Sequence, residues 1–253
     1  MRNIAFLFLC EAFSRTGSIV VLSSMALVGR ELAPHAALAT LPLALAPVTT
    51  MLVTVPAARL MQRRGRKVGF ALGAVLGMVG GLVGCAALFN EHFALLCVGA
   101  VGIGAVNGFS TYYRFAAAEV VDESRRSRAI SLVMAGGIVA AVAGSNLASW
   151  SRGLFPEHLF AGSYLAIAGI QVLVLCALSF VRFPAPSVAE SAGGGRSLRE
   201  IARDARFVTA LVGAVASWAV MSLLMNATPL SMHRHMHSFV DTAWVIQWHV
   251  LGM

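Results

Sequence analysis

Glu11 and Arg15 lie within residues 4–28, a run of the sequence that is otherwise almost wholly apolar. On a helix, residues four apart share one face, and Ser18 extends the same stripe. A charge at the centre of a membrane helix costs about 2.5 to 3.5 kcal/mol on insertion scales, so it should face a partner or a water-filled cavity. Two hypotheses follow: a self-satisfied ion pair inside a bundle, or a stripe that lines a permeation path and carries or senses a proton.

Further polar side chains interrupt later apolar runs and extend the second hypothesis. They are Asn107, Arg114, Asn226, Gln247 and His249. Snorkelling to the membrane interface is the alternative interpretation of Arg114. Histidine titrates near neutral pH, so His249 is a second candidate proton carrier, with hydrogen-bonded packing as its alternative.

The elements that must position these residues are membrane helices. Of the 253 residues 58% are hydrophobic and 12% charged, a composition typical of a polytopic membrane protein. Crossing a bilayer takes about 20 helical residues. Apolar runs of that order are residues 4–28, 36–58, 68–89, 93–118, 129–150, 160–181 and 207–230. The sequence therefore predicts an all-α polytopic membrane protein, with the first run retained as a span because it has no clear cleavage site.

An eighth apolar run begins near Phe239. At about 1.5 Å of rise per residue it reaches roughly 22 Å by Met253, which is short of a bilayer core. We therefore expect the natural chain to continue past Met253.

Cationic residues favour one orientation of the spans. Most arginines and lysines precede span 1 or follow spans 2, 4 and 6, whereas the other side has only Arg30, Arg152 and Arg234. Short loops rich in lysine and arginine stay in the cytoplasm, so we expect a cytoplasmic N-terminus in a cell inner membrane. The formal charge of +8 then reflects topology and predicts no nucleic-acid partner.

The domain organisation follows from a Pro/Ser/Gly-rich stretch between spans 6 and 7. We expect a six-span bundle over 1–182, a cytoplasmic linker over 183–206 and the start of a second bundle over 207–253. Ser197 and Glu200 form a capping-box pattern, which predicts a short amphipathic helix late in the linker. Glycine and alanine at spacing four, in Gly73 to Gly81 and Gly136 to Ala148, predict faces where helices approach closely.

Metal and cofactor chemistry find little support in the sequence. The four cysteines lie in apolar runs without ligand-like spacing. The histidines of SMHRHMHS alternate in a predicted outer loop, which is more simply a solvated turn than a metal site. We expect no cofactor and no metal.

The loop after span 2, ARLMQRRGRK, combines a glycine suited to a helix end with cations on both sides. It resembles the loop 2–3 signature of the major facilitator superfamily, matching at Arg63, Gly65, Arg66 and Lys67. Ala58 and Gln62 stand where that signature has a glycine and an acid.

This resemblance implies a twelve-span fold of two halves, with the solute bound at mid-membrane and spans 1, 4 and 7 lining the cavity. It also implies that Arg66 pairs with Glu119 as a cytoplasmic latch.

The hypothesis is a secondary transporter that moves a small organic solute by alternating access and is coupled to protons through Glu11 or His249. The two arginines, Arg15 and Arg114, mildly favour an anionic or zwitterionic solute. Transport then requires the missing C-terminal half. A transport-inactive fragment or half-transporter is one alternative, and an intramembrane enzyme built on Ser145 is another. Symport, antiport and uniport remain open.

Overall fold

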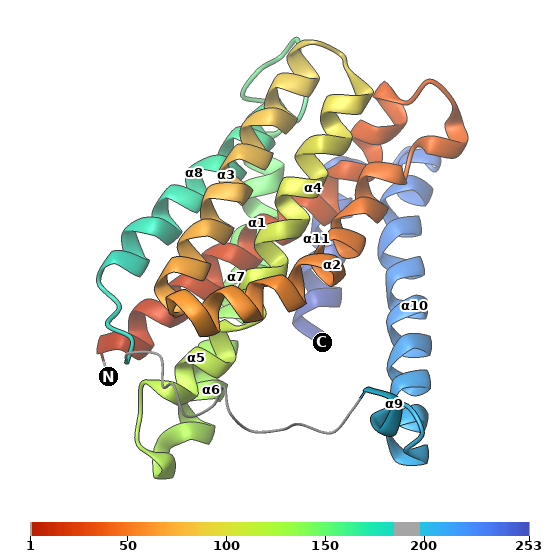
Figure 1. Cartoon of the computed structure of the whole chain (residues 1–253). Coiled ribbons are helices and arrows are strands. Elements are labelled where there is room, and N and C mark those ends of the chain that lie inside the picture. Colours follow the sequence, from red (N-terminus) through yellow and green to blue (C-terminus); the bar gives the residue numbers. More distant parts are fainter. Residues whose placement is uncertain (1, 185–197, 253) are drawn as a thin grey trace.

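The chain folds into long helices, most of which lie side by side in one bundle (Figure 1). The structure, a computed structural model, describes residues 2–184 and 198–252. Among these residues, seven helical stretches are long and apolar enough to cross a membrane. The α-helices are α1 (Arg2–Leu32), α2 (Leu41–Arg64), α3 (Arg66–Phe89), α4 (Phe93–Ser110), α5 (Tyr113–Glu119), α6 (Arg126–Met134), α7 (Gly136–Ser151), α8 (Ala161–Ser179), α9 (Leu198–Ile201), α10 (Ala205–Arg234) and α11 (Phe239–Gly252).

Close contact between small residues fixes how the bundle packs. Helix α3 packs on α4 and α8, α2 packs on α4, and α1 packs on α7 and α8. A Cβ added to Gly81 of α3 would lie 2.8 Å from the backbone nitrogen of Ala168 in α8. The same addition at Gly144 of α7 would lie 2.7 Å from the side chain of Ile19 in α1. The prediction that these faces let helices approach closely is confirmed, because only hydrogen atoms fit at these positions.

Spans 4 and 5 are each divided, where the sequence predicted continuous runs over 93–118 and 129–150. Span 4 is α4 followed by α5, with a turn at Thr111 and Tyr112. There the Tyr112 N–H donates to the oxygen of Phe109, and the Thr111 hydroxyl donates to that of Gly108 at 2.9 Å. Hydroxyl groups that bond nearby carbonyls compete with the helical pattern and tighten the turn. Span 5 also consists of two helices, α6 and α7, which are separated at Ala135.

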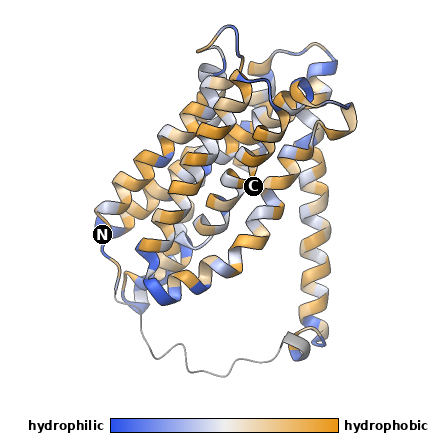
Figure 2. Ribbon diagram, turned by 45° about the horizontal axis from the view of Figure 1, so that its top comes forward, coloured by the Kyte–Doolittle hydropathy of each residue, from blue (hydrophilic) through white to orange (hydrophobic). Residues whose placement is uncertain are grey.

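Helix α10 lies apart from the bundle over its first half (Figure 1). This half is largely hydrophobic (Figure 2), and its large apolar side chains are exposed. Its second half packs through Met225 against Ile19 of α1, Ala140 of α7 and Ile246 of α11. Helix α11 itself packs on α7. The residues after span 6 are thus attached to the first six spans mainly through α1 and α7.

The linker prediction is only partly open to comparison, because Ser197 lies outside the described residues. Helix α9 has four residues, and Ala205 already begins α10. A short helix therefore lies late in the segment expected to be the linker, and the last residues of that segment, from Ala205, belong to α10. Asp204 explains the break, because its carboxylate accepts the Arg206 N–H at 3.0 Å and caps α10.

Candidate functional site

Glu11 and Arg15 form an ion pair within α1. The Arg15 Nε lies 2.9 Å from the Glu11 Oε1, and the two side chains are 44% and 3% exposed respectively. The spacing of four residues produces this geometry directly, since one helical turn separates them. The arginine therefore reaches open space, while the carboxylate is held inside the bundle.

Glu11 has neighbours on its own helix and on α5. Cys10 and Tyr113 lie near enough for the Glu11 carboxylate to act on them electrostatically. Tyr113 is fully buried and stacks on Phe70 of α3, with ring centroids 4.2 Å apart. Charges in such an enclosed position interact more strongly than in water.

One turn further along α1, a hydrogen bond crosses to span 4. The Ser18 hydroxyl donates to the Asn107 Oδ1 at 2.8 Å. Span 4 is also tied to α2, because the Thr50 hydroxyl donates to the Gly104 oxygen and the Tyr112 hydroxyl to the Thr54 oxygen, both at 2.9 Å. The polar stripe of α1 thus continues onto α4.

The other predicted pathway residues lie apart from the Glu11–Arg15 pair. Arg114 is exposed on α5 and lies over the ring of Phe115, 4.8 Å from its centroid. Asn226 is partly buried on α10, and Gln247 and His249 on α11. Across residues 2–184 and 198–252, no hydrogen bond or ion pair joins these four residues to Glu11 or Arg15. Among the same described residues, the Nε2 of His249 is buried and has no hydrogen-bond partner.

The inner loop places its residues around the α2–α3 turn. Gly65 has a φ of 89°, which favours glycine, and its N–H donates to the Met61 oxygen to end α2. Arg66 Nε donates to Glu119 Oε2 at 3.0 Å, and a second bond joins the same two groups. Lys67 donates to the Ser179 oxygen at 2.9 Å, while Arg63 is exposed. The loop is therefore tied to the ends of α5 and α8.

An outer cluster, which sequence reasoning missed, joins spans 5 and 6 to the segment after the linker. The guanidinium of Arg152 lies 5.3 Å from the ring centre of Phe160 and 5.2 Å from that of Phe239. Arg152 and His233 also act electrostatically on Glu31 at the end of α1. The sequence feature that could have pointed to this cluster is that Arg152 is one of few cations on the side predicted to be outer. We call these five residues the outer cluster.

Gln171 of α8 was also missed. It is 1% exposed, and its Oε1 has no partner among the described residues. Its side chain faces Gly17 of α1 and Gly77 of α3. A single amide inside an apolar run was the signal that could have found it.

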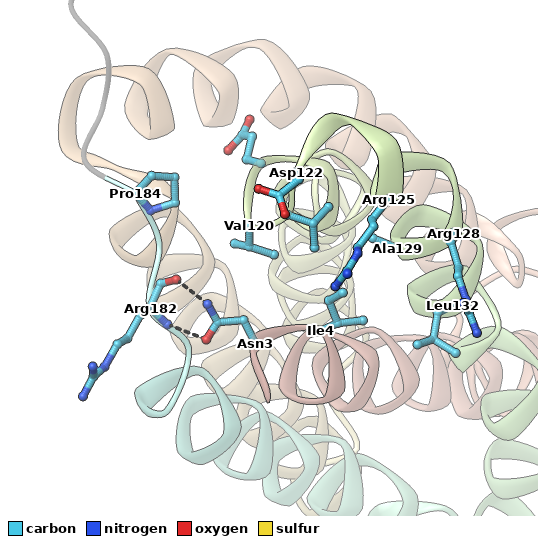
Figure 3. A pocket seen from close by; sticks show the side chains of 12 residues that line it. Asn3, Ile4, Val120, Asp122, Arg125, Arg128, Ala129, Leu132, Arg182 and Pro184 are labelled. Carbon is cyan, nitrogen blue, oxygen red and sulfur yellow. Dashed lines mark hydrogen bonds between the residues drawn. The ribbon is translucent and has the colours of Figure 1, made fainter. Parts of the chain in front are cut away.

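A cavity of about 750 Å³ lies at the end of the bundle where α1 begins, and Glu11 is not in its lining. Asn3 and Ile4 of α1, the end of α5, the start of α6 and the residues after α8 line it (Figure 3). Three arginines, Arg125, Arg128 and Arg182, belong to its lining.

Enzyme and metal chemistry gain no support from the geometry. The Ser145 hydroxyl donates to the Ala141 oxygen of its own helix at 3.0 Å, which is a common role for serine in membrane helices. Within the described part of the chain, no three His, Cys, Asp or Glu side chains are grouped to hold a metal ion.

Long apolar helices, a charge pair whose carboxylate is buried and a cationic loop after the second span define a polytopic membrane protein. The sequence model of the Major Facilitator Superfamily matches residues 4–250. The chain belongs to that superfamily.

Three relatives cover the whole chain. The riboflavin transporter RfnT of Brucella anthropi is 38% identical over 256 residues, which are 64% of its own length. Two uncharacterized MFS-type transporters of Bacillus subtilis, YddS and YdeG, are each 26% identical, over 61% and 62% of their lengths. The chain thus spans less than two thirds of the length of these relatives.

Proposed function

We propose that the full-length protein is a secondary transporter that carries a small organic solute across the cell inner membrane by alternating access. The observation that carries this proposal is the Glu11–Arg15 pair of α1, set beside the Ser18–Asn107 bond within a member of a transporter superfamily. Charged groups inside a membrane bundle are costly and are typical of solute or proton pathways. The concentration of cations at one end of the bundle supports a cytoplasmic N-terminus.

The solute that we propose is riboflavin or a closely related flavin. Support comes from the relative at 38% identity, whose name is riboflavin transporter. The exposed guanidinium of Arg15 has N–H groups beyond the one bonded to Glu11, and these suit ring carbonyl oxygens. An anionic or zwitterionic solute is the competing possibility, because a guanidinium also binds carboxylates and phosphates.

Proton coupling is proposed to run through Glu11. A carboxylate held by a single arginine can be released when the solute competes for that arginine, and it then gains a proton more readily. Glu11→Gln keeps the shape but cannot take up a proton. His249 is the second candidate, because its buried Nε2 lacks a partner.

The two ends of the bundle hold the contacts that alternating access would make and break. We assign Arg66 and Glu119 as an inner latch, in which Arg63, Gly65 and Lys67 shape and anchor the loop. The outer cluster, centred on Arg152 and Phe239, is assigned as the contact that closes the other end.

The direct test is uptake of radiolabelled riboflavin by cells that lack their own riboflavin uptake and express the full-length protein. We expect saturable uptake that collapses with a protonophore and is abolished by Glu11→Gln. Uptake that persists in Glu11→Gln with full protonophore sensitivity would move the coupling role to His249. Absence of riboflavin uptake by correctly inserted protein would remove the flavin assignment.

The half-transporter alternative is tested in the same cells. The 253-residue chain expressed alone should give no uptake, because the cavity needs two halves that rock about it. Uptake by this chain alone would contradict the requirement for a further half.

A further inference from the structure

The cavity at the inner end of the bundle combines two kinds of wall (Figure 3). Ile4 of α1, Val120 after α5 and Leu132 of α6 form an apolar side, and Leu132 is 47% exposed. Arg125 and Arg128 lie along the start of α6 and are both exposed. Apolar and cationic groups therefore meet in one hollow.

The two arginines are available for a ligand. The ion pairs of the described residues involve Arg15, Arg66 and Arg126, and neither Arg125 nor Arg128 takes part. In Figure 3 the side chain of Arg125 points toward Ile4, across the hollow, and that of Arg128 runs beside Leu132. The side chain of Arg182 points away, while its backbone is held by two hydrogen bonds to Asn3.

The acidic groups of the lining do not cancel this charge. Glu119 is already bonded twice by Arg66 on its other side. Asp122 is the remaining carboxylate of the lining, which also holds three arginines, so the lining keeps a positive balance. A guanidinium binds phosphate oxygens through paired N–H groups, and apolar walls beside it accept an acyl chain.

From this arrangement we propose that the inner cavity binds an anionic phospholipid of the cytoplasmic leaflet, with its phosphate on Arg125 and Arg128 and an acyl chain along Ile4 and Leu132. Basic pockets between membrane helices on the cytoplasmic side recognise anionic headgroups in this way. Because Glu119 is shared between this cavity and the inner latch, a bound headgroup lies next to the contact assigned to gating. The site rests on the proposed orientation but requires no particular solute.

The test is native mass spectrometry of the full-length protein released from nanodiscs of phosphatidylglycerol mixed with phosphatidylcholine. We expect retained phosphatidylglycerol, with affinity falling about 5-fold for each arginine lost and about 30-fold in Arg125→Gln/Arg128→Gln. Arg126→Gln is the matched control, because that arginine pairs with Glu123 at 3.7 Å and does not line the cavity. Asp122→Asn should raise the affinity, since it removes the opposing carboxylate.

Several results would overturn the site. Equal loss in Arg126→Gln and in the double variant would show a general surface charge effect. Equal retention of phosphatidylcholine would show that the arginines do not select the headgroup, and displacement by millimolar inorganic phosphate would point to a free anion site. If the glutamine double variant fails to fold, Arg125→Lys/Arg128→Lys, which keeps the charge, takes its place in the comparison. Lipid retention is measured without transport, so its failure is distinct from failure of the proposed function.

Discussion

Ser18 of α1 donates a hydrogen bond to Asn107 of α4, with 2.8 Å between the two oxygens, and so joins two spans that are 89 residues apart in the sequence. Hydrogen bonds between membrane helices contribute about 0.6 kcal/mol on average. A double-mutant cycle with Ser18→Ala and Asn107→Ala should therefore give a coupling energy near this value in denaturant unfolding. Ser23→Ala is the control, because the Ser23 hydroxyl bonds the Ile19 oxygen of its own helix and should show no coupling to Asn107.

The two members of the α1 ion pair should differ in their effect on stability. Arg15→Gln leaves a carboxylate that is 3% exposed without its cation, whereas Glu11→Gln leaves an arginine that water already reaches. We expect Arg15→Gln to be the more destabilising, by less than the about 3 to 5 kcal/mol of a fully buried pair. Unfolding of both variants in detergent decides this, and a larger loss in Glu11→Gln would contradict the burial seen at Glu11.

Gly80 is predicted to be intolerant of any side chain. A Cβ there would lie 2.8 Å from backbone atoms of α4, which cannot move aside as a side chain can. Gly80→Ala should cost about 1 to 3 kcal/mol in unfolding free energy. Gly169→Ala on α8 is the matched control, since nothing lies within 4 Å of the added atom. Similar losses at both positions would show that helix packing is not the cause.

Charge exchange tests the inner latch. Arg66→Glu alone and Glu119→Arg alone each place like charges together, so each should reduce uptake by the full-length transporter at least several-fold. The double exchange restores opposite charges across the same contact and should recover part of the activity. If all three variants transported as fast as the unchanged protein, a role for this pair in the transport cycle would be excluded.

The outer cluster predicts a change in conformation when Arg152 is replaced. Arg152→Lys keeps the charge but loses the planar group that lies over the rings of Phe160 and Phe239. We expect a longer spin-label distance between positions 35 and 237, in a background where Cys97 and Cys176 are serine. Arg30→Gln, another change to an outer arginine, should leave the distance unchanged. An unchanged distance in Arg152→Lys would separate this contact from closure of the outer end.

The extent of the spans was open to prediction from sequence, because the cost of placing polar groups in lipid acts on each segment by itself. Residues 68–89 and 160–181 became α3 and α8 within a few residues of their expected bounds. The breaks at Thr111 and Ala135 were not found; that at Thr111 involves a local hydroxyl bond, which a hydropathy pattern does not contain.

Some features of the site could likewise be predicted from the sequence, and others could not. Glu11 and Arg15 could be paired from their spacing alone, because one helix fixes their separation. Their unequal exposure could not, because it depends on which helices cover each side of α1. The ring contacts of Arg152 could not be predicted at all, since the two rings come from separate helices and the sequence neighbours of Arg152 indicate only an outer loop.

The sequence by itself determined that this is an all-α, multi-pass membrane protein of the major facilitator superfamily, because hydropathy, charge bias and the loop after span 2 are properties of local segments. Only the tertiary structure decided that Ser18 meets Asn107, that Phe239 covers Arg152, and that a cationic cavity lies at the inner end. Those relationships join residues far apart in the chain. They arise from the close packing of whole helices, which no single segment encodes.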